Sequence, residues 1–177
     1  KDDVFSSFSV HDAEWYKKDF GFYQDHVKAN SPEVFKKIEK LIKKNEALLN
    51  REAKYLVHGD MYPKNVFWSD GLKVSDWELL HLGVPMFDPC FIWALAWKEP
   101  NWQKDFFNSF KADLIYFNSS FESLIPIGQC IVLLRFIRHS EVMLAKVLSA
   151  NDEEAVINAK LALDAHKNNL KKVLKLG

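Results

Sequence analysis

The sequence predicts a mainly helical α+β domain in which a short β-hairpin interrupts a series of helices. The 177 residues are 48% hydrophobic and 27% charged, which suits one hydrophobic core of ordinary size. Six glycines and six prolines are few for a chain of this length, so turn-rich all-β folds are disfavoured. Apolar residues recur at helical spacing over long segments, and an Asp-Gly pair separates two β-prone runs.

The first part of the chain predicts helices. Residues 11–29 mix acidic and aromatic side chains, which fits one or two short amphipathic helices with Gly21 as a possible break. Ser31 is suited to cap a helix and Pro32 to occupy its first turn. Apolar residues then follow helical spacing, so one helix is expected over 32–50.

The middle of the chain changes to a β pattern. Residues 55–57 read as a short strand that leads into a loop. Two further β-prone runs, 66–68 and 72–74, flank Ser69, Asp70 and Gly71, which is the signature of a hairpin.

Helices dominate again after this segment. Asp88 and Pro89 predict the start of a buried helix, with Asp88 as its N-cap, and this helix is expected to end near Pro100. Further helices are expected over 102–118, 123–149 and 152–175.

The hairpin turn determines which residues face each other at the open end of the ribbon. With Asp70 and Gly71 as a two-residue turn, Asn65 lies opposite Asp76. Directly opposed residues have Cβ atoms about 4.5–5.5 Å apart, so an amide oxygen and a carboxylate would converge as ligands suited to Mg²⁺. A three-residue turn would shift the register by one residue and weaken this prediction.

Asp60 lies in the loop before the hairpin, five residues ahead of Asn65. In kinases an Asp accepts the proton of the acceptor hydroxyl, an Asn five residues later holds metal, and another Asp binds the Mg²⁺ of the nucleotide. Asp60, Asn65 and Asp76 occur in this order and spacing. The combination favours a phosphoryl-transfer site over a structural loop with a capping Asp.

Three short motifs follow one another here: HGDMYPKN at 58–65, VSDWE at 74–78 and GVPMFD at 83–88. Together they resemble the aminoglycoside phosphotransferase and choline kinase group of kinase-like small-molecule phosphotransferases. The flanking helices fit the helical C-terminal lobe of that protein-kinase-like fold, which extends the resemblance over the chain at lower specificity. One residue departs from the pattern, since Ser75 stands where an apolar residue is more usual.

The resemblance implies a role for each polar residue of the motifs. Asp60 would be the catalytic base or the acid that positions the acceptor. Asn65 and Asp76 would bind the Mg²⁺ of ATP, so that the hairpin carries the metal ligands. Asp88 would brace the catalytic loop from the start of the buried helix, and His58 would support that loop.

Glu78 has two interpretations: it contacts substrate or metal, or it is an exposed or structural acid. Kinase chemistry also requires a Gly-rich loop over the phosphates and a lysine from a small β-lobe. The six glycines never come closer than twelve residues apart, so no such loop is encoded. Residues 1–177 are therefore expected to form one C-terminal lobe, with the N-terminal β-lobe absent from this chain.

Charge, apolar runs and cysteine content limit the kinds of partner and compartment that the sequence predicts. Lys and Arg number 24, as do Asp and Glu, so the zero net charge gives no attraction toward nucleic acid or an anionic membrane. The longest apolar run, 124–137, is too short and interrupted to span a bilayer. Cys90 and Cys130 fit reduced core thiols of a cytoplasmic protein.

The predicted function is an ATP- and Mg²⁺-dependent phosphotransferase acting on a small-molecule hydroxyl. A non-catalytic, kinase-derived binding module and a metal-dependent hydrolase are the alternatives. The sequence does not identify the small-molecule substrate, because each residue that could contact it could instead serve the packing or the surface of the fold. The candidates are a quaternary-ammonium cage, acids for aminoglycoside amines, and an anion site or a salt-bridged surface stripe at Arg135, Arg138 and His139. The cage would use Trp93, Trp97, Trp102, Tyr116 and Phe117, and the acids are Glu122 and Glu141.

Overall fold

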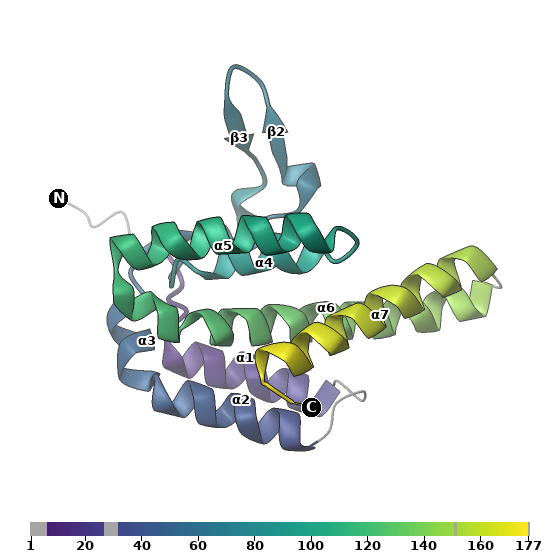
Figure 1. Ribbon diagram of the computed structural model, residues 1–177, viewed down its shortest axis with the longest axis horizontal. Helices are drawn as coiled ribbons and strands as arrows, with labels where there is room; N and C mark the ends of the chain where they lie inside the picture. The colour runs from purple at the N-terminus through teal and green to yellow at the C-terminus, as the bar shows by residue number, and fades with distance from the viewer. Residues whose placement is uncertain (1–6, 27–31, 151, 177) are drawn as a thin grey trace.

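The computed structural model describes residues 7–26, 32–150 and 152–176, and Figure 1 shows a helical body from which one hairpin projects. The prediction of a mainly helical fold with short strands is confirmed. The helices are α1 (Ala13–His26), α2 (Pro32–Lys44), α3 (Glu46–Glu52), α4 (Phe87–Leu95), α5 (Pro100–Phe117), α6 (Ile125–Ala150) and α7 (Glu153–Val173). The strands are β1 (Tyr55–Val57), β2 (Val66–Trp68), β3 (Leu72–Val74) and β4 (His81–Gly83), with 3₁₀ turns η2 (Pro63–Asn65), η3 (Trp77–Leu79) and η4 (Ser119–Ser123).

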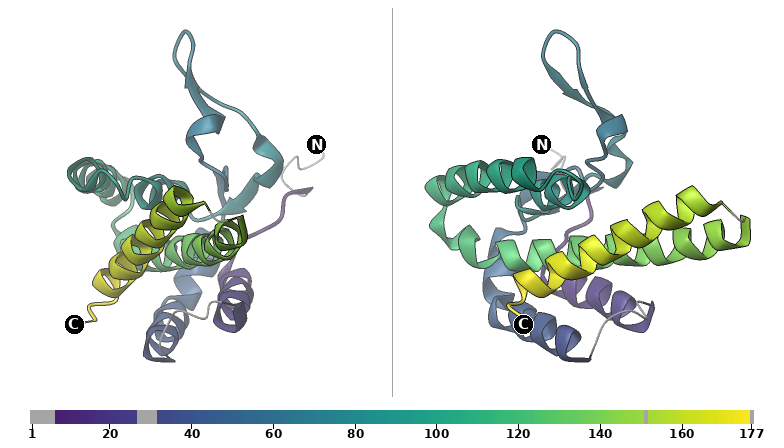
Figure 2. Two further views of the ribbon diagram at one scale, coloured as in Figure 1. Left: turned by 90° about the vertical axis from the view of Figure 1, so that its right-hand side faces the viewer. Right: turned by 45° about the vertical axis from the view of Figure 1, so that its right-hand side comes forward.

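Helix α6 runs through the middle of the body, with α4 and α5 on one side and α1 and α2 on the other (Figures 1 and 2). Nearly every residue of its first half is buried, because neighbouring helices surround it. Its second half pairs with α7 and extends as an arm beyond the other helices. The core therefore lies around the first half of α6, directly beneath the loops that carry the sequence motifs.

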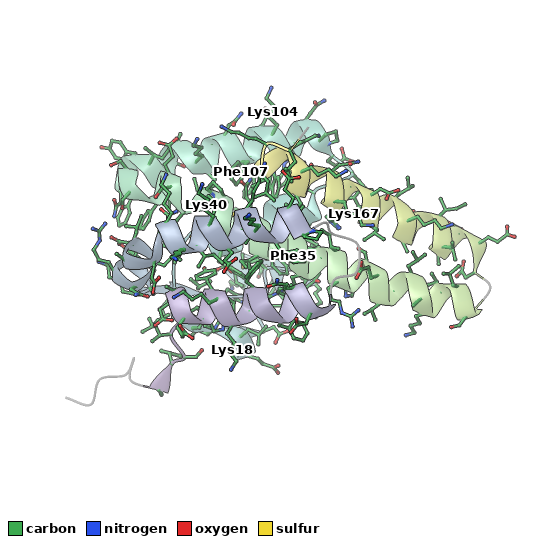
Figure 3. The ribbon with its side chains drawn as sticks, turned by 90° about the horizontal axis from the view of Figure 1, so that it is seen from below. Lys18, Phe35, Lys40, Lys104, Phe107 and Lys167 are labelled. Carbon is green, nitrogen blue, oxygen red and sulfur yellow. The ribbon has the colours of Figure 1, made fainter. Side chains whose placement is uncertain are left out.

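Helices α1 and α2 close the core from the side opposite the hairpin. The rings of Phe20 and Phe35 lie 5.7 Å apart between these helices. Figure 3 shows Phe35 in the interface, whereas Lys18 and Lys40 point outward from the same two helices. The lysine-rich face of α2 is thus exposed to solvent.

Two of the predicted helices differ from the structure by more than a shift of their ends by a few residues. The helix expected over 32–50 is divided into α2 and α3 at Asn45, whose side-chain amide donates to the carbonyl of Leu41 at 2.9 Å. The side-chain amide shares the Leu41 carbonyl with the backbone amide of Asn45, and the helix is interrupted by a turn at this residue. Helix α4 begins at Phe87 and ends at Leu95, earlier than predicted. The prediction that Asp88 is its N-cap was wrong, because Met86 occupies that position.

The strands form two separate antiparallel pairs, β1 with β4 and β2 with β3. Strand β4 was not predicted from the sequence; it pairs Val57 with His81 and brings the segment after the hairpin beside the loop that follows β1. Pairing with a strand so far along the chain supplies the hydrogen bonds that so short a strand needs.

The hairpin register also differs from the prediction. Trp68 pairs with Leu72, so the loop has three residues, and the amide of Ser69 donates to the carbonyl of Gly71 at 2.9 Å. Asp70 and Gly71 both have positive φ, 50° and 127°, which Asp and Gly tolerate better than other residues.

The predicted opposition of Asn65 and Asp76 was therefore wrong. The amide of Ser75 donates to the carbonyl of Asn65 at 2.9 Å, so that Ser75 is the neighbour of Asn65 across the ladder. Asp76 follows one residue later, after β3 has ended at Val74, and has a left-handed backbone at the foot of the hairpin.

Both cysteines are buried and free, as predicted. Burial raises the pKa of both thiols, which keeps them protonated. No helix in the described part of the chain is long and apolar enough to cross a membrane.

Candidate active site

The loop after β1 is fixed by His58, whose ring contacts both the loop itself and the segment that follows the hairpin. Its Nε2 lies 2.9 Å from the carbonyl of Ser75, and its Nδ1 accepts the amide of Asp60 at 3.2 Å. The proton of the neutral ring is thus on Nε2 and is donated to Ser75. The ring also packs edge-on against Trp77, with centroids 4.7 Å apart. These contacts tie the loop to the end of the hairpin.

Asp88 holds the same loop from helix α4. Its Oδ2 accepts the amide of His58 at 2.8 Å and its Oδ1 accepts the amide of Gly59 at 2.9 Å. Burial raises the pKa of Asp88, and the two backbone amides oppose that rise. A carboxylate shared by two successive amides fixes the path of the backbone at this point.

Gly59 is required where the loop turns. Its φ is +81°, and a Cβ here would lie 2.9 Å from the carbonyl oxygen of Leu79 and 3.1 Å from the ring of His81. Any side chain would therefore meet both the positive φ and the backbone behind it. The glycine lets the loop pass close under the segment that leads to β4.

Asp60 and Asn65 are in direct contact. The buried Asn65 donates its side-chain amide to the backbone carbonyl of Asp60 at 3.0 Å and to Oδ2 of its carboxylate at 3.1 Å. Asp60 Oδ1 accepts no hydrogen bond from any described residue, and Asp60 is half-buried. Asp60 therefore has one carboxylate oxygen without a hydrogen bond to a described residue. The amide oxygen of Asn65 is likewise not used in either of these bonds.

Asp76 has a left-handed backbone, with φ 65° and ψ 63°, and its side chain caps nothing. Asp tolerates this conformation better than most residues with a side chain, and left-handed residues other than glycine gather at functional sites. Asp76 is exposed. The structure thus leaves its carboxylate free at the foot of the hairpin, next to the residue that pairs with Asn65.

The donor atoms suit Mg²⁺ better than a soft metal. Asn65 and Asp76 offer an amide oxygen and a carboxylate, and Mg²⁺ is commonly bound by one or two protein oxygens with water and phosphate completing its shell. Among the described residues no group of three or more His, Cys, Asp or Glu could hold a metal. A site made wholly of protein ligands is therefore not built here.

A hollow of about 260 Å³ lies behind the loop, and Glu78 is at its wall together with Gly59 and Arg135. Arg135 of α6 points its guanidinium to the carbonyl of Gly59 at 3.4 Å and covers the ring of Phe87 at 5.2 Å. Neither Arg135 nor Arg138 forms an ion pair with a described residue. Among the described residues the two arginines therefore do not form the expected salt-bridged stripe. Arg135 instead donates to the backbone of the loop that contains Gly59.

The contribution of Arg135 was missed from the sequence, although a signal was present. It is the one charged residue in the apolar run 124–137, most of which is buried. A cation in such a run needs a polar partner, and the carbonyl of Gly59 supplies one.

Two histidines in the hollow are neutral at physiological pH. The rings of His11 and His81 stack with centroids 3.5 Å apart. Burial, with smaller effects from His81 and Arg135, lowers the pKa of His11 to about 3. Burial also lowers the pKa of His81. The positive charge beside the loop thus comes from Arg135 and not from these imidazoles.

The predicted substrate contacts are not brought together. Trp93 is buried in the core, whereas Tyr116 is 95% exposed near the end of α5. Trp97 packs against His166, and Glu122 forms an ion pair with Lys111 at 2.9 Å. These residues do not form an aromatic cage or an acidic cluster in the structure.

A model of the phosphotransferase enzyme family matches residues 10–116, more than half of the chain. The chain belongs to this family. The match contains all three motifs, so the resemblance found in residues 58–88 is confirmed, and family membership implies a kinase-like fold. No curated protein and no solved structure matches the chain.

Proposed function

We propose that this member of the phosphotransferase enzyme family transfers the terminal phosphate of ATP to a hydroxyl group of a small molecule. The observation that carries the proposal is the pairing of Asp60 with Asn65. One oxygen of Asp60 is held by the Asn65 amide, while the other stays free at the surface of the loop. A half-buried carboxylate fixed in this way is suited to accept a proton from a bound alcohol.

In this mechanism Asp60 Oδ1 accepts the proton of the acceptor hydroxyl as that oxygen attacks the terminal phosphorus. The bond from phosphorus to the bridging oxygen breaks, and ADP leaves with that electron pair. His58 and Asp88 fix the loop through the contacts described above, so that Asp60 need not reorganise when the acceptor binds. Positioning and proton acceptance are the contributions of this chain.

Asn65 and Asp76 would hold Mg²⁺ with ATP. The bound ion would neutralise charge on the phosphates as the reaction proceeds. The free amide oxygen of Asn65 and the uncapped carboxylate of Asp76 support this assignment. Mn²⁺ titration followed by electron paramagnetic resonance tests it without any need for turnover.

We further propose that residues 1–177 are the C-terminal lobe of the enzyme. Its glycines are too widely spaced for a phosphate-binding loop. The coding sequence upstream of Lys1 tests this directly: a Gly-rich hairpin followed by a strand lysine supports the proposal. A start codon near residue 1 contradicts it and favours a non-catalytic binding module.

The proposed activity is tested by incubating the protein, expressed from its full coding sequence, with ATP, Mg²⁺ and a panel of alcohols while ADP is measured. ADP release that depends on the alcohol, with a phosphate ester as product, supports the proposal. Equal ADP release with no alcohol present indicates an ATP hydrolase and contradicts it.

A further inference from the structure

A groove of about 340 Å³ lies on the surface beside the Asp60 loop, between the foot of the hairpin and helices α4 and α5. All the described side chains in its wall are apolar, and none is fully buried. They are Met61, Pro63, Val66, Ile92, Leu95, Ala96 and Trp102. Its volume falls in the range of small-molecule sites, which is roughly 300–1,000 Å³.

One wall of the groove belongs to the segment that carries the proposed catalytic residue. Met61 follows Asp60 directly, and Pro63 and Val66 flank Asn65 in and after η2. Two hydrogen bonds from Asn65 to Asp60 close this segment into a compact loop. One wall of the groove therefore begins at the residue next to Asp60, in the same hydrogen-bonded loop.

The opposite wall offers a fixed aromatic face. Trp102 of α5 stacks on Phe106 with centroids 5.0 Å apart and an interplanar angle of 7°, yet it remains 50% exposed. A ring held flat by its neighbour can pack against an apolar ligand with little loss of side-chain entropy.

The charge of the groove decides between classes of acceptor. No described residue in its wall carries a charge, so nothing there would pair with an amine or an ammonium group. Nor do the aromatic residues that could cage a quaternary ammonium converge on it, since of these only Trp102 is in its wall. An uncharged, apolar group complements such a surface.

We propose that this groove binds the apolar body of the acceptor, so that the substrate is an alcohol carrying an aromatic or alicyclic hydrocarbon group. The inference rests on the proposed phosphotransferase function and names its substrate class. The hydroxyl group of such an alcohol lies toward Asp60 while its hydrocarbon part packs between Met61 and Trp102.

The test compares two alcohols of different charge, 3-phenylpropan-1-ol and choline, by saturation-transfer NMR on the full-length protein. We expect the wild type to bind phenylpropanol at least about tenfold more tightly than choline. Trp102→Ala should weaken phenylpropanol binding about tenfold, because it removes the aromatic wall. Tyr116→Ala, which removes an exposed aromatic ring from the same helix, should leave the affinity unchanged.

A second variant keeps the test independent of Trp102. Ala96→Asp places a carboxylate in the wall and should shift the preference toward choline. Equal affinity for both alcohols in the wild type would overturn the proposal, as would unchanged phenylpropanol binding in Trp102→Ala. Circular dichroism of each variant shows that a loss of binding does not reflect unfolding.

Binding and phosphorylation assays together distinguish a failure of the proposed acceptor class from a failure of the proposed phosphotransferase function. Binding of phenylpropanol with no phosphate ester formed from any alcohol would support the apolar site and contradict the phosphotransferase function. Phosphorylation of choline or an aminoglycoside, with no binding of phenylpropanol, would support the function and overturn the apolar acceptor class.

Discussion

Replacing Asp88 should loosen the catalytic loop and destabilise the whole domain. The carboxylate accepts the amides of His58 and Gly59 at 2.8 and 2.9 Å, so Asp88→Ala leaves two amides without an acceptor. Each unsatisfied buried amide costs roughly 1–3 kcal/mol, so the two together predict a loss of about 2–6 kcal/mol in the free energy of unfolding. Asp88→Asn keeps one acceptor oxygen and should lose about half as much.

Urea unfolding followed by circular dichroism measures these losses, and hydrogen exchange of the His58 and Gly59 amides locates them. Asp105→Ala is the matched control, because Asp105 is exposed on α5, and it should change stability by less than about 0.5 kcal/mol. The reasoning is refuted if Asp88→Ala unfolds with the same free energy as the control. It is also refuted if the two amides keep their protection from exchange.

Three other predictions follow from single residues. Gly59→Ala should lose about 1–3 kcal/mol of stability in urea unfolding, because its φ is +81° and its Cβ would lie 2.9 Å from the Leu79 carbonyl oxygen. Gly21→Ala, in open space on α1, should instead gain about 0.5–1 kcal/mol, and equal effects of the two changes would contradict this account. Burial lowers the pKa of His166 from 6.5 to about 4. Between these two pH values the imidazole binds a proton in the unfolded chain but not in the folded one, so the folded state loses stability as the pH falls. The unfolding free energy of the wild type should therefore drop about 2 kcal/mol further than that of His166→Phe between about pH 7 and about pH 5, and parallel pH curves would refute the assignment. Asp76→Ala should weaken Mn²⁺ binding in the presence of ATP by at least about tenfold in a paramagnetic resonance titration, and unchanged affinity would remove Asp76 from the metal site.

Much of the fold could be predicted from local patterns. Helical spacing of apolar residues located the helices on both sides of the β segment, and the Asp-Gly pair located the hairpin. These features depend on neighbours within a few residues, which a sequence displays directly. The motif residues from His58 to Asp88 could be picked out for the same reason, since their order and spacing are visible without a structure.

The errors arose where distant or subtle contacts decide the outcome. The hairpin has a three-residue loop with Trp68 paired to Leu72, a register that the Asp-Gly pair alone does not determine. Strand β4 forms by pairing with β1, which lies far from it in the sequence. The carboxylate of Asp88 does not cap its own helix but accepts the amides of His58 and Gly59, thirty and twenty-nine residues earlier in the chain. Arg135 joins the site from α6 for a similar reason, because only tertiary packing brings it to Gly59.

The central claim is that Asp60 accepts the proton during phosphoryl transfer, and one measurement tests it most directly. Full-length wild type, Asp60→Asn and the exposed control Asp105→Asn are compared for the rate of phosphate transfer from ATP to an accepted alcohol. We predict that Asp60→Asn lowers kcat by at least about 100-fold with its fold and its nucleotide affinity unchanged, while the control matches the wild type. An Asp60→Asn protein that transfers phosphate at the rate of the wild type would contradict the account.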